Sequence, residues 1–151
     1  MAEVSLRLDA FIPYLLSVTS NLVSDAIAGS YQALFGLTIP EWRLIAVIGE
    51  DDGITQQQVG HRTRMDKVTV SRATIALVGR GLVERQPHRS DRRSQSLHLT
   101  KAGHDLYDQV APKALELERQ IFAGFDPKDV AAFSEMLARI RDVTLKIGGE
   151  V

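Results

Sequence analysis

Cysteine is absent from this chain of 151 residues, and its absence removes several kinds of chemistry. Without thiols the protein can form no disulfide, no zinc–thiolate site and no thiol-based redox sensor. Long apolar runs are also missing, since none approaches the roughly 20 residues that a membrane-spanning helix needs. The N-terminal segment lacks the basic-then-apolar order of a signal peptide. We therefore expect a cytoplasmic protein.

Enzyme motifs are missing as well. The sequence has no phosphate-binding glycine loop and no serine or cysteine nucleophile motif. His104 and Asp108 lie one helical turn apart and could bind a metal, but no third ligand has metal-like spacing, which favours a surface pair. The other histidines, His61, His88 and His98, lie in a basic stretch and are interpreted as polar surface or phosphate contacts. We expect neither catalysis nor a bound metal or cofactor.

Charge is distributed unevenly along the chain. Hydrophobic residues make up 44% of the sequence, which is enough for a globular core, and the net charge is only −1. Residues 61–101, however, contain ten Lys or Arg and three Asp or Glu, a net charge of +7, whereas the remainder carries −8. A basic block in an acidic protein is typical of a surface that binds a polyanion. The alternative is a solvated charged face without a partner.

The apolar periodicity predicts six helices and one β-hairpin. The first helix, from about Leu8 to Leu34, is apolar on nearly all sides, which favours burial against a partner subunit. Pro13 lies early in it and is expected either to start the helix or to kink it there. The other helices are predicted at about 40–50, 56–62, 66–80, 101–122 (interrupted by Pro112) and from 126 onward, and the strands at 82–86 and 95–99. The side chains expected to cap these helices are those of Thr38, Thr55, Asp66 and Thr100. A short helix, a turn and a second helix form a helix-turn-helix arrangement.

Five segments resemble the multiple-antibiotic-resistance-regulator (MarR) family of winged-helix transcription factors, in the family's order and spacing. They are Leu37-Thr38…Glu41-Trp42-Arg43, Asp66-Lys67…Thr69-Val70-Ser71-Arg72, Gly81-Leu82-Val83, Asp91-Arg92-Arg93 and Leu97…Leu99-Thr100…Gly103. The fold expected is mainly α with a small β-hairpin wing (α+β). A winged helix-turn-helix over residues 35–100 is expected to bind DNA, and residues 1–34 and 101–151 are expected to form a helical dimerisation region. A dimer doubles the contacts and reads a pseudo-palindrome.

The fourth helix is the expected reader of bases. If Val70, Ala73, Thr74 and Leu77 face the core, then positions 68, 69 and 72 face outward with Ser71 on the flank. Such a helix fits the DNA major groove. Arg72 is either a bidentate guanine contact or the partner of Glu84 or Asp66 in a salt bridge. Val68 either packs on a thymine methyl group or is a tolerated surface valine.

The charged tip of the hairpin is the second expected contact. The resemblance implies that Arg93 enters a minor groove and that Asp91 pairs with an arginine to hold it. A narrow A·T-rich minor groove attracts such an arginine; the alternative is a charged loop tip without a partner. Phosphates are expected at the start of the third helix and at the other basic wing residues. The full expected set is Gln56, Arg64, Lys67, Val68, Thr69, Ser71, Arg72, His88, Arg89, Asp91, Arg92 and Arg93.

The resemblance also implies a repressor that a small ligand releases from DNA, with a pocket where the dimer helices meet the winged domain. The candidate pocket residues are Tyr14, Ser17, Asn21, Trp42 and Arg43. Trp42 is more simply explained as a core residue of that junction, and Arg43 as the partner of an acid across the dimer. The expected partners are double-stranded DNA, a second copy of the chain and an aromatic acid or its CoA thioester, without a membrane. The alternative is a winged-helix module that binds proteins, or DNA non-specifically, without ligand control.

Overall fold

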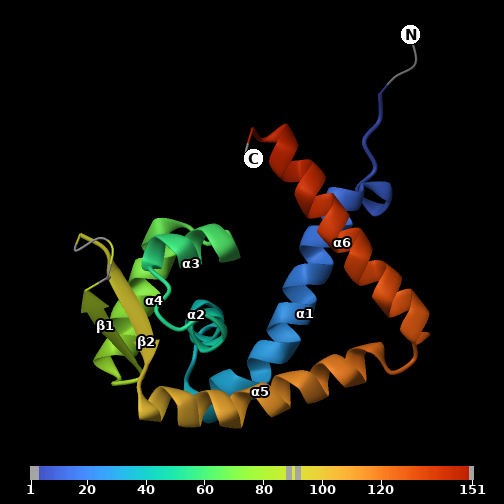
Figure 1. Cartoon of the computed structure of the whole chain (residues 1–151). Coiled ribbons are helices and arrows are strands. Elements are labelled where there is room, and N and C mark those ends of the chain that lie inside the picture. The colour runs from blue at the N-terminus through green and yellow to red at the C-terminus, as the bar shows by residue number, and fades with distance from the viewer. Residues whose placement is uncertain (1–3, 88–89, 91–92, 150–151) are drawn as a thin grey trace. The chain divides into compact units, whose positions relative to one another are not determined.

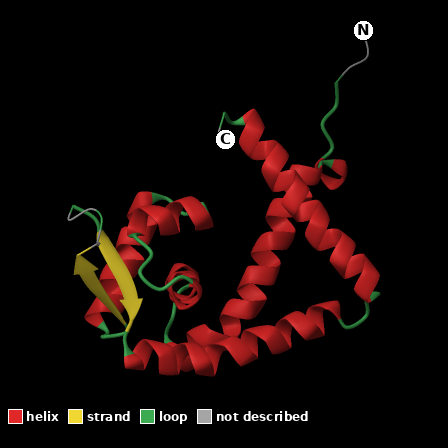
Figure 2. Ribbon diagram, in the orientation of Figure 1, coloured by secondary structure: helices red, strands yellow, loops and turns green. Residues whose placement is uncertain are grey.

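The structure, a computed structural model, describes residues 4–87, 90 and 93–149 (Figure 1). The chain forms two compact units, Met1–Leu115 and Glu116–Val151. A 3₁₀ turn at Leu8–Ala10 precedes the regular elements, which Figure 2 shows in the same orientation. These are α1 (Ile12–Phe35), α2 (Ile39–Glu50), α3 (Gln56–Thr63), α4 (Lys67–Gly79), β1 (Val83–Pro87), β2 (Gln95–Leu99), α5 (Lys101–Phe122) and α6 (Pro127–Ile147). This order confirms the predicted mainly α fold with a β-hairpin.

The two prolines within predicted helices had different outcomes. Pro13 starts the first helix, which is one of the two alternatives predicted for it, whereas the predicted interruption at Pro112 was wrong. The first helix begins at Ile12 rather than near Leu8, with Pro13 in its first turn. Proline lacks an N–H and has a preset φ, so it suits the first turn of a helix and disfavours a continuous helix through it from Leu8. Pro112, in contrast, does not interrupt α5, which continues from Lys101 to Phe122. The buried residues of α5 that precede Pro112 include Leu106 and Val110, and their packing holds that part of the helix on the core.

Side chains cap the helices as predicted. The side chains of Thr38 and Thr55 each accept a hydrogen bond from the backbone N–H three residues ahead. In return, the side chains of Glu41 and Gln58 accept hydrogen bonds from the backbone N–H groups of Thr38 and Thr55. These reciprocal capping boxes satisfy backbone donors that a helix start leaves without partners. Thr100 caps α5 through the N–H of Gly103 at 3.1 Å. The starts of three helices in the first unit are therefore determined by residues within one turn of each.

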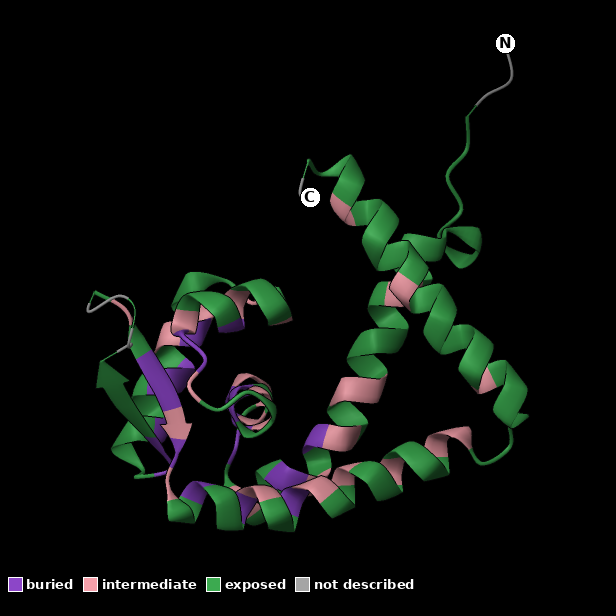
Figure 3. Cartoon of the chain, in the orientation of Figure 1, coloured by how far each residue is buried: buried purple, intermediate pink, exposed green. Residues whose placement is uncertain are grey.

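The core of the first unit lies among α2, α3, α4, β2 and the beginning of α5. Its most deeply buried apolar residues are Leu44, Ile45, Ile48, Val59, Leu77, Leu97 and Val110. Figure 3 shows the buried residues concentrated in this winged part of the chain, whereas α1 and α6 are largely exposed. Apolar burial is the main favourable term in folding, so the winged part contains most of the stabilising surface.

The hairpin is fastened to the helices by a short backbone segment. β1 and β2 are antiparallel, with Val83 opposite Leu99 and Pro87 opposite Gln95. On the other side of β2, the N–H of Gly53 donates to Leu97, and the N–H of Leu97 donates to Ile54, both at 2.9 Å. The loop between α2 and α3 therefore extends the small sheet and connects the hairpin to the helix-turn-helix. Among the described residues, no helix is long and apolar enough to cross a membrane.

Candidate nucleic-acid interface

The two faces of α4 differ in the way the sequence predicts. Val70, Ala73, Thr74 and Leu77 are buried. On the opposite face Arg72 is exposed and the Val68 side chain is 58% exposed, while Thr69 and Ser71 are partly buried at its edges. The alternative salt bridges of Arg72 are not formed, because no ion pair joins it to any residue that the structure describes.

Asp66 caps α4 and also restrains Thr69. Its carboxylate accepts the backbone N–H of Thr69 at 2.7 Å and the Thr69 hydroxyl at 2.9 Å. The backbone N–H of Thr69, followed by its hydroxyl, holds the pKa of the Asp66 carboxyl below its usual value. Because the Thr69 hydroxyl hydrogen is already engaged, its oxygen is left to accept a hydrogen bond from a partner.

A groove of about 740 Å³ lies between the helix-turn-helix and the base of the wing. It is open to solvent. Four of the predicted DNA contacts line it, namely Gln56 at the start of α3, Lys67 and Ser71 on α4, and Arg93 before β2. The structure therefore brings together residues that are up to 37 positions apart in the sequence. Two cations at the edge of such a groove attract an anionic partner.

Gln56 has a feature that the sequence did not reveal. Its side-chain Nε2 is buried and has no hydrogen-bond acceptor among the residues that the structure describes. A buried donor without a partner is costly, by about 1–3 kcal/mol. At this helix start the capping box engages the N–H of Gln58, so the backbone N–H groups of Gln56 and Gln57 are those that have no partner within the helix. Gln56 thus offers hydrogen-bond donors to an acceptor in the groove.

Of the remaining predicted DNA contacts, the structure describes Arg64 and leaves four wing residues undescribed. Arg64 occupies the turn between α3 and α4, where it adopts a left-handed conformation with a φ of 61°, and its side chain is exposed. It does not line the groove. His88, Arg89, Asp91 and Arg92 lie outside the described residues, so their predicted contacts are not examined by the structure. Arg93 is described and exposed.

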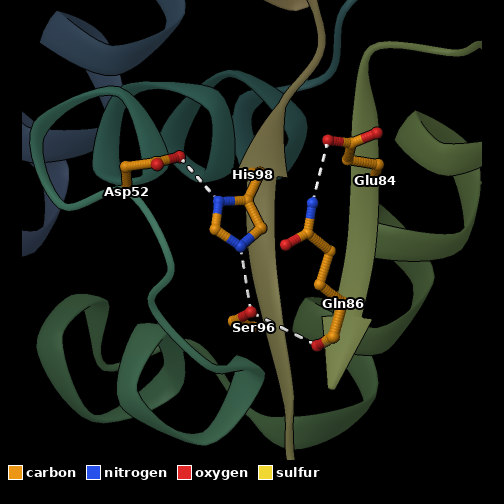
Figure 4. Close-up of polar contacts among 5 residues, drawn as sticks. All are labelled: Asp52, Glu84, Gln86, Ser96 and His98. Carbon is orange, nitrogen blue, oxygen red and sulfur yellow. Dashed lines mark hydrogen bonds and ion pairs between the residues drawn. The ribbon is translucent and has the colours of Figure 1, made fainter. Parts of the chain in front are cut away.

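Sequence reasoning missed a polar network at the base of the wing. His98 was interpreted as polar surface or a phosphate contact, yet its Nδ1 lies 3.0 Å from Asp52 Oδ1 and its Nε2 lies 2.9 Å from Ser96 Oγ (Figure 4). Ser96 in turn donates to the backbone carbonyl of Gln86 at 3.2 Å. The alternation Ser96–His98 placed both residues on one face of a strand. Asp52, 46 residues away, could not be assigned to them from the sequence.

The five candidate effector residues are placed in two groups. Tyr14, Ser17 and Asn21 are exposed on α1. Trp42 is partly buried between two tyrosines, with ring centroids 5.8 Å from Tyr31 and 5.8 Å from Tyr107. This arrangement agrees with a core role for Trp42 at the junction of α1, α2 and α5.

Arg43 is exposed beside the same aromatic cluster. Burial raises the pKa of the Tyr31 phenol, and the positive charge of Arg43 acts in the opposite direction. None of the five candidate effector residues lines the groove between α3, α4 and the wing. In the part of the chain that the structure describes, no three His, Cys, Asp or Glu side chains are grouped in a way that could hold a metal ion.

Comparison with known proteins identifies this arrangement. The sequence profile of the MarR family matches residues 35–94, which include α2, α3, α4, β1 and Arg93. A MarR-family transcriptional regulator from Silicibacter pomeroyi is 28% identical; the alignment covers 93% of this chain and 92% of that one, with a TM-score of 0.75. Residues 35–94 of this chain belong to the MarR family.

Other relatives agree with this assignment. The HTH-type transcriptional regulator YwoH of Bacillus subtilis is 28% identical over 102 residues, which are 68% of this chain and 74% of that protein. The structure of CouR from Rhodococcus jostii RHA1, bound to p-coumaroyl-CoA, is 25% identical with a TM-score of 0.79, covering 90% of this chain and 95% of that one. The protein is accordingly a winged-helix, DNA-binding transcriptional regulator.

Proposed function

We propose that this MarR-family regulator acts in the cytoplasm as a homodimeric repressor that recognises a pseudo-palindromic operator. The observation that carries the proposal is the grouping of Lys67, Ser71 and Arg93 around one groove, beside the exposed Arg72 and Val68 of α4. α4 would enter the major groove of each half-site, and Arg93 an adjacent minor groove. Residues 35–100 would form the DNA-binding domain.

Base readout is assigned to the exposed face of α4. Arg72 is free of ion pairs with described residues, so its guanidinium is available for a bidentate contact with guanine. Val68 is exposed at the first turn, where an apolar side chain fits a thymine methyl group. Thr69, oriented by Asp66, offers its oxygen to a base or water.

Phosphate contacts would position the helix without reading sequence. Gln56 supports this role because its buried Nε2 lacks an acceptor among the described residues and borders the groove. A phosphate oxygen would satisfy that donor together with the backbone N–H groups at the start of α3. Lys67 on the same groove and Arg64 in the turn would add positive charge.

The dimer is assigned to α1, α5 and α6, in residues 1–34 and 101–151. α1 exposes many large apolar side chains, with Leu22 at 65% exposure. α6, in the second unit, exposes Phe133, Met136, Val143 and others. Apolar surfaces of this extent are unusual on a soluble monomer and indicate burial against another chain. A second copy would also supply the second half-site reader.

We further propose that a small ligand releases the protein from DNA. CouR, a relative by structure, is bound to p-coumaroyl-CoA, and the aromatic cluster around Trp42 offers stacking surface. Tyr14, Ser17, Asn21 and Arg43 would supply polar contacts for an aromatic acid or its CoA thioester. Titration of such compounds into the protein–DNA complex tests this: an unchanged operator affinity with every compound would contradict ligand control.

Arginine substitutions test the operator proposal once the protected duplex near the protein's own gene has been found by footprinting. Arg93→Ala is expected to weaken binding to that duplex by about 10- to 100-fold, because one well-placed contact contributes about 1–3 kcal/mol. Arg72→Ala should relax the preference at one base position. Fluorescence anisotropy measures both, with Arg139→Ala on exposed α6 as the charge-matched control.

A competition experiment between operator DNA and random-sequence duplex distinguishes the proposed operator-specific repressor from the alternative, a module that binds DNA without sequence specificity. Equal affinity for operator and random DNA would favour that alternative, and an Arg93→Ala protein that binds as tightly as the native one would contradict the wing assignment. The logarithm of the affinity should also fall steeply with the logarithm of salt concentration, because several phosphate contacts per dimer release counterions.

A further inference from the structure

The contacts among Asp52, His98, Ser96 and Gln86 link three parts of the first unit. Asp52 lies in the loop between α2 and α3, Ser96 and His98 lie on β2, and Gln86 lies on β1 (Figure 4). Ser96 is only 8% exposed and the His98 side chain 21% exposed. The contacts therefore form a relay, hereafter the wing relay, from the helix-turn-helix loop through β2 to the backbone of β1.

The wing relay requires more hydrogens than a neutral histidine can supply. Each of its three contacts needs one hydrogen between two heavy atoms. The Ser96 hydroxyl supplies one, a neutral imidazole supplies one, and an imidazolium supplies two. With neutral His98, one contact is therefore always left without a hydrogen, whichever ring nitrogen carries the proton. With protonated His98, Nδ1–H donates to Asp52, Nε2–H donates to Ser96, and Ser96 donates to the Gln86 carbonyl.

The relay ends at the root of the wing. Gln86 and Ser96 are opposite each other in the register, and only the pair Pro87–Gln95 lies between them and the wing tip. Arg93 follows in the same direction, three residues before Ser96. A bond between Ser96 and the Gln86 carbonyl therefore fixes the point from which the arginine-bearing tip leaves the sheet.

We propose that His98 is a positioning residue for DNA binding, whose protonation completes the wing relay and orients the wing that carries Arg93. The proposal rests on the proposed DNA-binding function. A histidine side chain ordinarily gains its proton as pH falls through about 6.5. Operator affinity should therefore rise as pH falls from about 8 to about 6. The rise should be larger than the one that protonation of the other histidines would produce.

Among the residues that the structure describes, two ionisable side chains are paired with His98, one by a hydrogen bond and one by strand register. Asp52 accepts from Nδ1, and Glu84 is the register partner of His98 on β1, where it accepts from the side-chain amide of Gln86 at 3.3 Å. Neither acid forms an ion pair with a lysine or arginine among the described residues. Asp52 and Glu84 are both negatively charged when ionised, and negative charge next to a histidine ring favours its positively charged imidazolium form.

The order Asp–His–Ser is also that of a hydrolase triad, but the geometry does not suit catalysis. A nucleophilic serine must reach a substrate and give its proton to histidine. Ser96 is buried within a strand and donates its hydrogen to the Gln86 carbonyl. It also does not line the groove beside α4. The relay therefore acts on wing geometry rather than on a bound substrate.

Nuclear magnetic resonance of the DNA-free protein tests the relay directly. Ring nitrogen shifts report the protonation of His98, and backbone amide shifts report β1 and β2. We expect the amides of Gln86 and Ser96 to change with the same midpoint as the ring. In Ser96→Ala the backbone amide of Gln86 should no longer follow the His98 ring. The proposal would be overturned if, in the native protein, the backbone amide shift of Gln86 did not change together with the ring nitrogen shifts of His98.

Operator binding then tests the consequence for function. Anisotropy is measured from about pH 8 to about pH 6 at constant ionic strength, for the native protein, Ser96→Ala, His98→Gln and, as control, His104→Gln on the exposed face of α5. The native protein and the control should gain about three- to tenfold more affinity over this range than the two relay variants. Identical pH profiles for the native protein and Ser96→Ala would overturn the proposal. Failure of every protein to bind operator would instead overturn the proposed function, while the amide titration still decides the relay.

Discussion

At the scale of single residues, Asp66 links the start of α4 to a residue predicted to contact DNA. Its carboxylate is acceptor for both donors of Thr69. The interaction is between near neighbours in sequence, and the N-cap role of Asp66 was predictable from the residue type and its position before an apolar periodic run. The second bond, to the Thr69 hydroxyl, depends on a rotamer that only the structure shows.

Asp66→Asn should lower the melting temperature in a manner that depends on pH. The folded pKa of Asp66 is lowered, so its carboxylate contributes stability that is fully present above the unfolded pKa of about 3.9 and is lost as pH falls through the folded pKa. Asparagine can cap the helix but lacks the charge. The melting-temperature difference between the two proteins should therefore be constant near neutrality and shrink below about pH 4. Circular dichroism would contradict this if the difference stayed constant in acid.

At the scale of elements, the junction of β1, β2 and α5 depends on one glycine. The Thr100 N–H donates to the Leu82 carbonyl at 3.1 Å and its hydroxyl donates to the Gly81 carbonyl at 2.6 Å. These two hydrogen bonds hold the start of α5 against the backbone of Gly81 and Leu82, just before β1. Gly103 faces the same carbonyl, and a Cβ placed on it would lie 2.1 Å from the Leu82 oxygen. Such a distance leaves no room for any side chain.

Gly103→Ala is therefore expected to destabilise the protein by about 3 kcal/mol or more, because the clash is with backbone rather than with a flexible side chain. The matched control is Gly79→Ala at the end of α4, where a Cβ would meet nothing within 4 Å. Alanine is the better helix former, so the control should gain about 0.5–1 kcal/mol. Urea denaturation measures both, and equal stabilities of the two variants would refute the close approach.

At the scale of the whole molecule, the exposed apolar residues of α1 and α6 lead to a prediction about assembly. The chain has a mass of 16.7 kDa, and we expect sedimentation to show a species of twice that mass. Leu22→Glu should weaken the dimer by about 100-fold or more, since it would bury an unpaired charge. Ile75→Glu on α4, at a residue of similar exposure, should leave it intact. A native protein that stays monomeric at high concentration would exclude this mode of operator recognition.

Local chemistry explains the parts of the fold and site that the sequence determined. Capping by Thr38, Thr55, Asp66 and Thr100 and the division of α4 into buried and exposed faces depend on residues three or four positions apart. The same holds for the resemblance to the MarR family, whose motifs are short segments in a constant order. The effect of Pro112 on α5 was misjudged because packing outweighed local propensity, whereas the start of α1 at its first-turn proline was one of the two outcomes predicted for Pro13.

Only the tertiary structure decided which distant groups meet. It placed Gln56 beside Arg93 along one groove, Gly103 against Leu82, and Asp52 against His98. Each pair joins elements whose relative position follows from burial of a shared core, and no periodicity in the chain encodes that position. The exposed face of α4, which we propose contacts DNA, could therefore be predicted from its own residues. The contacts of the proposed wing relay became visible only in the folded structure, where the core brings the loop and both strands together.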